Sequence, residues 1–128
     1  MARYLTDSDV LIWVLRNRRD TVDLLTRLAE ETGEPLACSA ISILEIWNGA
    51  KPSETRRTSI FLETLQVIPI DHAIARLAAQ LLKSSRREKS SREWVDAMIA
   101  ATAVQNRMTL LTYNRKDYPY TDITLYPL

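Results

Sequence analysis

Asp96 is the residue whose type and spacing most strongly indicate chemistry. In a helix predicted over residues 94–106, Ile99, Ala100 and Ala103 follow it at i+3, i+4 and i+7, so its carboxylate lies on the apolar face that would pack on a sheet. An unpaired carboxylate buried there is costly in free energy or stays protonated, and it therefore needs a compensating partner. An acid in the first turn of a helix can also simply offset the helix dipole, and that alternative stays open.

Three further acids occupy positions where they could join Asp96. Asp7 directly follows a predicted first strand, Glu45 lies in the middle of a predicted helix, and Asp117 follows a predicted strand at residues 109–112. Each has an ordinary alternative: a turn or helix cap for Asp7, a solvated helix face for Glu45 and turn chemistry for Asp117. Because the carboxyl ends of parallel strands meet at one edge of a sheet, we expect the four acids to converge on one pocket.

Carboxylates that converge on one pocket can do only a few kinds of chemistry. Such groups repel one another, so they share protons or hold a cation. Oxygen ligands without thiolate or imidazole select Mg²⁺ or Mn²⁺ rather than zinc. A divalent ion held in this way activates water and neutralises charge on a phosphate that is being displaced. Thr112 and Asn114 add polar side chains at the end of the strand that precedes Asp117. The residues therefore predict metal-assisted phosphodiester chemistry.

The composition excludes several other kinds of site. The 128 residues contain only two glycines, Gly33 and Gly49, which rules out glycine-rich phosphate loops, whose glycines lie within six residues of one another. One cysteine, Cys38, and one histidine, His72, cannot build a zinc site, and a lone cysteine cannot form an internal disulfide. We interpret Cys38 as a small core residue and His72 as a capping or surface residue. A Ser-His-Asp triad would depend on His72 alone and is not favoured.

The sequence shows no targeting or membrane segment. The N-terminal residues reach an acid at Asp7 and contain no apolar signal-peptide core. The longest nearly apolar stretch, residues 97–104, is far shorter than the roughly 18 residues that a membrane span requires. A chain that cannot form an internal disulfide also fits a reducing compartment. We therefore expect a cytoplasmic protein with no membrane partner.

Extended runs alternate with amphipathic helices along the chain. Strands are predicted at residues 3–6, 36–38, 66–70 and 109–112, with a weak fifth at 123–126. Helices are predicted to start near the cap-forming residues Asp7, Ser8 or Asp9, Asp20, Ser39, Ser53, Asp71 and Ser90. This order predicts an α/β fold: a single domain over residues 1–128, built as an α/β/α sandwich with a parallel sheet of four to five short strands flanked by helices.

Four segments of the sequence, taken together, resemble the motifs of a PIN-domain ribonuclease. They are YLTDSDVLI at residues 4–12, SILEI at 42–46 followed by Gly49, DAMIAATA at 96–103 and LLTYNRKDY at 110–118. The segments occur in the family's order and cover essentially the whole chain. The third is the most specific, whereas the first alone would be weak. In size, the chain looks most like the VapC-type toxin of a bacterial or archaeal toxin–antitoxin pair.

The resemblance implies a role for each matching position. Asp7, Glu45, Asp96 and Asp117 would be the acidic quartet that binds Mg²⁺ or Mn²⁺ and cuts RNA through a metal-activated water. Four polar neighbours would support these ligands or line the substrate pocket: Ser8, Asp9, Thr112 and Asn114. Family members typically form homodimers. A small antitoxin protein blocks their active site, and operator DNA is bound only through that antitoxin.

The charge distribution fits an RNA substrate better than the net charge of +1 suggests. If the four acids face one cation, the remaining chain has 17 basic residues against 12 acidic ones, the total of 16 less those four. The basic run at residues 83–92 is predicted as an exposed loop, in which Arg86 and Arg87 could contact RNA phosphates. Arg115 and Lys116 could do the same. A loop that is merely solvated is the alternative for the basic run.

Two departures from the family pattern are visible. The glycine usually found between the third-motif helix and the following strand is absent, and Asn106 is expected to take the left-handed position in its place. The segment after Tyr118 is short, which leaves the dimer surface and the fifth strand unassigned.

Two other function classes stay open at the level of the sequence. The first is a phosphohydrolase with an aspartyl nucleophile, because Asp7-Ser8-Asp9 after the first strand is also a DxD pattern. The lysine and the later acidic pair that usually accompany that motif are not evident. The second is a non-catalytic interaction module with a PIN fold, which the presence of all four acids argues against.

Overall fold

The computed structural model describes residues 3–85 and 90–128. Within these residues, the centre of the fold is a sheet of four short parallel strands in the order β3-β2-β1-β4. In chain order they are β1 (Tyr4–Thr6), β2 (Ala37–Ser39), β3 (Gln66–Ile68) and β4 (Thr109–Leu111). Leu5 in β1 pairs with Ala37 in β2 and Leu110 in β4, so the carboxyl ends of the strands lie along one edge. The predicted parallel sheet is confirmed.

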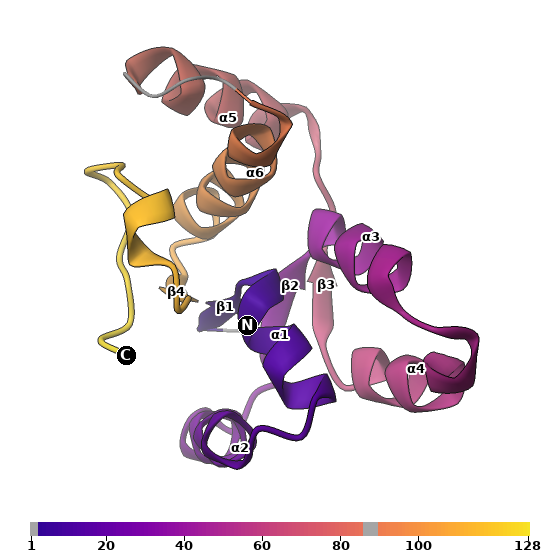
Figure 1. Ribbon diagram of the computed structural model, residues 1–128. Helices are drawn as coiled ribbons and strands as arrows, with labels where there is room; N and C mark the ends of the chain where they lie inside the picture. The colour runs from indigo at the N-terminus through magenta and orange to yellow at the C-terminus, as the bar shows by residue number, and fades with distance from the viewer. Residues whose placement is uncertain (1–2, 86–89) are drawn as a thin grey trace.

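Helices flank the sheet on both faces (Figure 1). Those in the described residues are α1 (Ser8–Leu15), α2 (Arg19–Thr32), α3 (Ala40–Gly49), α4 (Thr55–Glu63), α5 (His72–Ser84) and α6 (Ser91–Gln105). The pair α5 and α6 covers one face, and α1, α2 and α4 lie on the other with α3 beside α1. Over residues 3–85 and 90–128, every helix falls short of the length and hydropathy needed to cross a bilayer.

Successive residues of a strand pack against opposite faces of the sheet. Leu5 and Leu110 pack with α5 and α6, whereas Leu111, one position along β4, packs with α1 and α2. Cys38 is buried, and that burial raises the pKa of its thiol to about 11, which agrees with the predicted core role. His72 is exposed at the first position of α5, also as predicted.

The cap-forming residues start several helices where the sequence predicts them. The side chains of Ser39, Asp71 and Ser90 each accept a hydrogen bond from a backbone N–H in the first turn of the helix that follows. Gly33 ends α2 with a φ of 67°, in the left-handed conformation that glycine adopts without a Cβ clash. These local signals position α3 and α6, which carry two of the predicted acids.

Two of the predicted capping residues, Asp20 and Ser53, do not cap their helices, although both helices begin within two residues of them. The helix α2 begins at Arg19, so Asp20 lies in its first turn, where it pairs with Arg18 at 2.8 Å instead of capping the helix. The segment around Ser53 forms a short 3₁₀ turn, η1 (Pro52–Glu54), and α4 starts only at Thr55. The Glu54 carboxylate accepts a hydrogen bond from the Lys51 N–H at 2.7 Å, which closes this turn ahead of the helix.

The C-terminal segment differs from the expectation of a fifth strand. It forms a single bridge between Leu110 and Leu125. The Leu110 N–H donates to the Thr124 carbonyl and the Tyr126 N–H donates to the Leu110 carbonyl. The Tyr126 carbonyl, which the next rung would use, instead accepts hydrogen bonds from the Leu128 N–H and the Arg115 guanidinium. The sheet of the described residues therefore keeps four strands.

Two details around α6 also differ from expectation. Arg107, with a φ of 54°, takes the left-handed position after the helix, while Asn106 keeps a φ of −99°. The basic run at residues 83–92 is not one loop, because α5 extends to Ser84 and α6 begins at Ser91, which makes Arg92 helical.

Candidate active site

Asp7 follows β1 at the carboxyl edge of the sheet and is 1% exposed. Its Oδ2 accepts hydrogen bonds from the Thr112 hydroxyl and the Tyr118 phenol, each at 2.8 Å. Its Oδ1 accepts one from the Ser8 N–H at 2.7 Å, as the cap of α1. Burial raises the pKa of Asp7 above its usual value, and the three hydrogen bonds oppose that rise. The carboxylate is thus fixed in one orientation.

Asp96 lies on α6 and is also 1% exposed. Both of its carboxylate oxygens are buried and have no hydrogen-bond partner. Burial raises the pKa of Asp96 to about 7, and the negative charge of Asp7 adds to the rise. Arg92 opposes it through its positive charge. The predicted placement on the buried helix face is confirmed, and the carboxylate has no hydrogen bond that would explain its burial.

Glu45 reaches the same region from α3. Its Oε1 accepts a hydrogen bond from the Ser8 hydroxyl at 2.6 Å, and Ser8 Oγ also lies 2.8 Å from Ser42 Oγ. The other oxygen, Oε2, is 2.6 Å from Nη1 of Arg92. Arg92 in turn places its Nε 3.7 Å from Oδ1 of Asp96. Glu45 therefore lies in the same cluster as Asp96 and is held by Ser8 and Arg92, so it is not a fully solvated side chain.

Asp9 connects the first turn of α1 to the segment after β4. Its Oδ2 accepts hydrogen bonds from the Tyr113 N–H at 3.1 Å and from the Asn114 side-chain amide at 2.8 Å, and its Oδ1 accepts one from the Val10 N–H at 2.7 Å. Burial, followed by the charge of Asp7, raises the pKa of Asp9 to about 6. Asp9 supports the loop that carries the fourth acid.

Asp117 ends a short 3₁₀ turn, η2 (Arg115–Asp117), and is partly buried. Its charge raises the pKa of Asp96, which places it electrostatically within the same cluster. Arg115 and Lys116 are exposed on this turn, and the Arg115 guanidinium donates to the Tyr126 carbonyl at 2.9 Å. The other two predicted phosphate contacts, Arg86 and Arg87, lie outside the described residues.

Two residues of the cluster were not assigned to it from the sequence. Arg92 precedes Asp96 by four positions, and this i,i+4 spacing on a helix is a signal that could have identified the pair. Tyr118 had no comparable signal, because the direction of its phenol depends on the path of η2. Burial, together with the charge of Asp7, raises the pKa of Tyr118 well above its ordinary value, so its O–H remains a donor to Asp7.

The donor chemistry of the cluster fits a hard divalent cation. Asp96 offers two buried oxygens that nothing else satisfies, and the surrounding acids offer further carboxylate oxygens. Over residues 3–85 and 90–128, no three His, Cys, Asp or Glu side chains come close enough to form a metal site as they stand. Glu45 is instead held by Ser8 and Arg92. Carboxylate oxygens of this kind suit a hard divalent cation such as Mg²⁺ or Mn²⁺.

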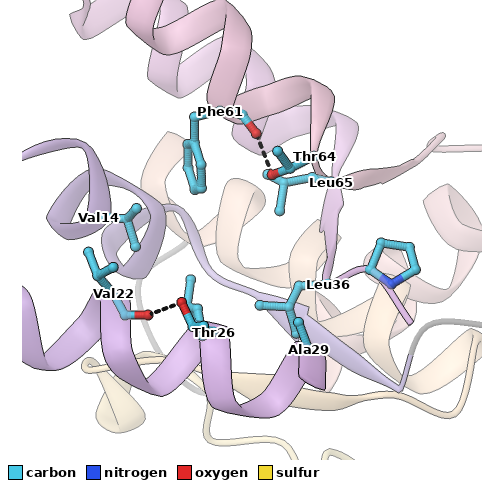
Figure 2. A pocket seen from close by; sticks show the side chains of 10 residues that line it. Val14, Val22, Thr26, Ala29, Leu36, Phe61, Thr64 and Leu65 are labelled. Atoms are coloured by element: carbon cyan, nitrogen blue, oxygen red, sulfur yellow. Dashed lines mark hydrogen bonds between the residues drawn. The ribbon is translucent and has the colours of Figure 1, made fainter. Parts of the chain in front are cut away.

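A separate apolar pocket of about 320 Å³ lies away from the acids. Figure 2 shows Val22, Thr26 and Ala29 on α2 facing Phe61 and Leu65 at the far side. None of the residues that line it is acidic. This pocket therefore has no chemistry of its own and is not the candidate active site.

Comparison with known proteins gives consistent matches over nearly the whole chain. The model of the PIN domain family matches residues 4–121. Ribonuclease VapC10 of Mycobacterium tuberculosis is 36% identical over 115 residues, which cover 90% of this chain and 85% of that protein. Ribonuclease VapC19 of the same species is 29% identical over 115 residues, covering 90% and 91%. A solved toxin–antitoxin complex from Klebsiella pneumoniae contains a chain with a TM-score of 0.76 at 29% identity, covering 98% of this chain and 99% of that one.

Proposed function

The chain belongs to the PIN-domain family, and we propose that it is an endoribonuclease that acts as the toxin of a toxin–antitoxin pair. Its relatives at 36% and 29% identity are named as ribonucleases. The similar solved chain comes from a toxin–antitoxin complex. We propose Mg²⁺ or Mn²⁺ as the cofactor, because the cluster offers carboxylate oxygens without thiolate or imidazole.

The observation that supports this proposal most directly is the state of Asp96. Two buried carboxylate oxygens without any hydrogen bond lower the free energy of unfolding, so their burial needs an explanation such as a bound ion. A divalent cation would compensate them. We propose that Asp7, Glu45, Asp96 and Asp117 are the metal-binding and catalytic acids. When bound, the cation would lower the pKa of a water and neutralise charge on the phosphate.

The remaining polar residues orient these acids. Thr112 and Tyr118 occupy Oδ2 of Asp7, and Ser8 N–H uses one lone pair of Oδ1. One lone pair of Oδ1 is thus left for a cation. The Ser8 hydroxyl holds Glu45.

The η2 turn, which carries Asp117, is fixed by the loop before it. Asp9 binds Asn114 and the backbone of Tyr113, and the Thr112 hydroxyl accepts a hydrogen bond from the Asn114 N–H at 3.0 Å. Arg115 and Lys116, exposed on the same turn, are proposed to contact RNA phosphates.

We propose a small antitoxin protein as the partner and a homodimer as the assembly. Exposed apolar side chains flank the acids in sequence: Leu44 and Trp47 on α3 beside Glu45, and Trp94 on α6 beside Asp96, with 62%, 39% and 58% of their surfaces exposed. Exposed apolar side chains on the two helices that carry Glu45 and Asp96 favour a protein partner over free solvent. A protein bound there would cover the acids and stop cleavage.

The test is RNA cleavage by the purified chain with Mg²⁺ or Mn²⁺, compared with the same chain in EDTA. We expect cleavage only with metal, and we expect Asp7→Asn and Asp96→Asn to reduce it to the level seen in EDTA. Asp23→Asn, an exposed acid on α2, is the matched control and should cut normally. The proposal fails if the wild type cuts no RNA under these conditions and Asp96→Asn is as toxic to cells as the wild type.

The aspartyl-nucleophile alternative is less favoured, because the lysine and the later acidic pair that usually accompany its DxD motif are not evident in the sequence. Hydrolysis of a phosphate monoester by a preparation that leaves RNA intact would favour that alternative. A chain that does neither but binds a protein partner would be the non-catalytic module.

A further inference from the structure

We propose that Arg92 is a built-in counterion that competes with the divalent cation for Glu45 and Asp96. Its guanidinium would hold these two acids while no metal is bound, and it would raise the metal concentration at which the site fills. The inference rests on the proposed function, because it concerns the loading of the same acidic site.

The geometry places one guanidinium between acids of two different helices. Nη1 of Arg92 is 2.6 Å from Oε2 of Glu45 on α3, and Nε is 3.7 Å from Oδ1 of Asp96 on α6. The Asp96 side chain is 2% exposed and the Glu45 side chain 22%. A cation that uses Oε2 of Glu45 and Oδ1 of Asp96 would compete with Arg92 for the oxygens that face it.

The two cations exclude one another at these oxygens. Mg²⁺ bonds carboxylate oxygens at about 2.1 Å and demands a nearly ideal octahedral arrangement. A guanidinium in contact with Glu45 and beside Asp96 occupies part of that space, and its positive charge repels the ion. Metal binding therefore requires Arg92 to leave at least one of the two acids.

Arg92 is well placed to leave. Its side chain is 51% exposed and starts from the first turn of α6, so it can extend into water without burying an unpaired charge. The buried acid cannot do the same, because Asp96 is fixed on α6 at 2% exposure and makes no hydrogen bond. The arrangement therefore favours exchange of one cation for another over simple opening of the ion pair.

The first experiment measures Mn²⁺ binding to the full chain by calorimetry, without RNA. Arg92→Gln removes the charge, and we expect its Kd for Mn²⁺ to be about tenfold lower than that of the wild type, the size of a typical coupling between two sites. Arg92→Lys keeps a charge without the planar fork and should be intermediate. The matched control is Arg27→Gln, because Arg27 is also exposed, at 59%, and its Nε lies 3.8 Å from Glu31 within α2. Its Kd should equal that of the wild type.

The outcomes separate this inference from the proposed function. If the wild type binds Mn²⁺ and Arg92→Gln binds it equally or more weakly, the competition is refuted while the metal site stands. If neither the wild type nor any Arg92 variant binds Mn²⁺, the proposed metal chemistry is refuted as well.

A second measurement needs no variant. In the wild-type chain, the Nε–H signal of Arg92 in a ¹H–¹⁵N NMR spectrum should move toward the position of a solvated arginine as Mg²⁺ is added. The backbone amide signals near Asp96 should shift over the same concentration range. An Arg92 signal that stays in place while those amides shift would overturn the inference even if Arg92→Gln failed to fold.

Discussion

The phenolic oxygen of Tyr118 lies 2.8 Å from Oδ2 of Asp7, a buried contact that spans 111 positions of the chain. Thr112 donates to the same oxygen, so two hydroxyls from the segment after β4 fix a carboxylate that follows β1. This contact joins β1 to its neighbour β4, the strand at the edge of the sheet, at their carboxyl ends. It also determines which oxygen of Asp7 remains available to a cation.

Removal of the Tyr118 hydroxyl should destabilise the fold, although the aromatic ring stays in place. Tyr118→Phe deletes one of two donors to a buried carboxylate, and a hydrogen bond to a charged group contributes about 1.5–3 kcal/mol. Because Thr112 still donates to that oxygen, we expect a loss near the low end, about 1–2 kcal/mol, in the free energy of unfolding measured with urea. Tyr126→Phe is the control, because the Tyr126 phenol has only an exposed 3.4 Å contact with Arg27. Equal losses for both variants would contradict the proposed importance of the Tyr118 contact.

Asp9 should control the order of the loop before η2. In Asp9→Ala, the Tyr113 N–H and the Asn114 amide lose their acceptor, and an unsatisfied donor costs about 1–3 kcal/mol. We expect hydrogen exchange at the Tyr113 amide to accelerate by about tenfold or more, since 1.4 kcal/mol corresponds to a factor of ten. Asp9→Asn keeps one acceptor oxygen and should show a smaller change. If exchange at Tyr113 is unchanged in Asp9→Ala, Asp9 does not hold this loop.

Local sequence signals predicted much of the frame that carries the site. The caps at Ser39 and Ser90 start α3 and α6 as expected, and the spacing of Ile99, Ala100 and Ala103 correctly placed Asp96 on a buried face. These features depend on residues within one or two turns of each other. That is why periodicity and cap chemistry are sufficient to predict them.

Contacts between distant segments could not be predicted in the same way. The Glu45 carboxylate was assigned to the site, but its ion pair with Arg92, 47 positions away, depends on how α3 packs beside α6. The phenol of Tyr118 turns toward Asp7 only because η2 brings it there. The prediction of a fifth strand was wrong for a related reason. The C-terminal segment forms only one bridge, at Leu125, and whether it forms more depends on how closely it approaches β4.

The metal-free protein should lose stability as the pH rises from about 4 to about 7. Burial raises the pKa of Asp9 to about 6 and that of Asp96 to about 7. Between the ordinary value of 3.8 and these values, the folded chain binds more protons than the unfolded chain, so the free energy of unfolding falls as the pH increases. For Asp96, a rise of roughly three pKa units corresponds to at most about 4 kcal/mol. Urea unfolding in EDTA across this range measures the trend, and stability that rises steadily from pH 4 to pH 7 would contradict it.

Asp96→Asn should stabilise the metal-free protein at pH 8 and yet remove its response to metal. At that pH the wild-type carboxylate is charged, 2% exposed and without a hydrogen bond, whereas the amide is neutral. Its ion pair with Arg92 at 3.7 Å offsets only part of this cost, because Arg92 is half exposed. We expect a gain of about 1–3 kcal/mol in EDTA, less than the full cost because the buried amide is also unpaired. With Mn²⁺ at 100 times its Kd, the wild type should gain about 2.7 kcal/mol while the variant gains almost nothing. Asp23→Asn, exposed on α2, should follow the wild type in both conditions. A variant that is less stable than the wild type at pH 8 in EDTA would show that the Asp96 charge is compensated within the chain and does not need a cation.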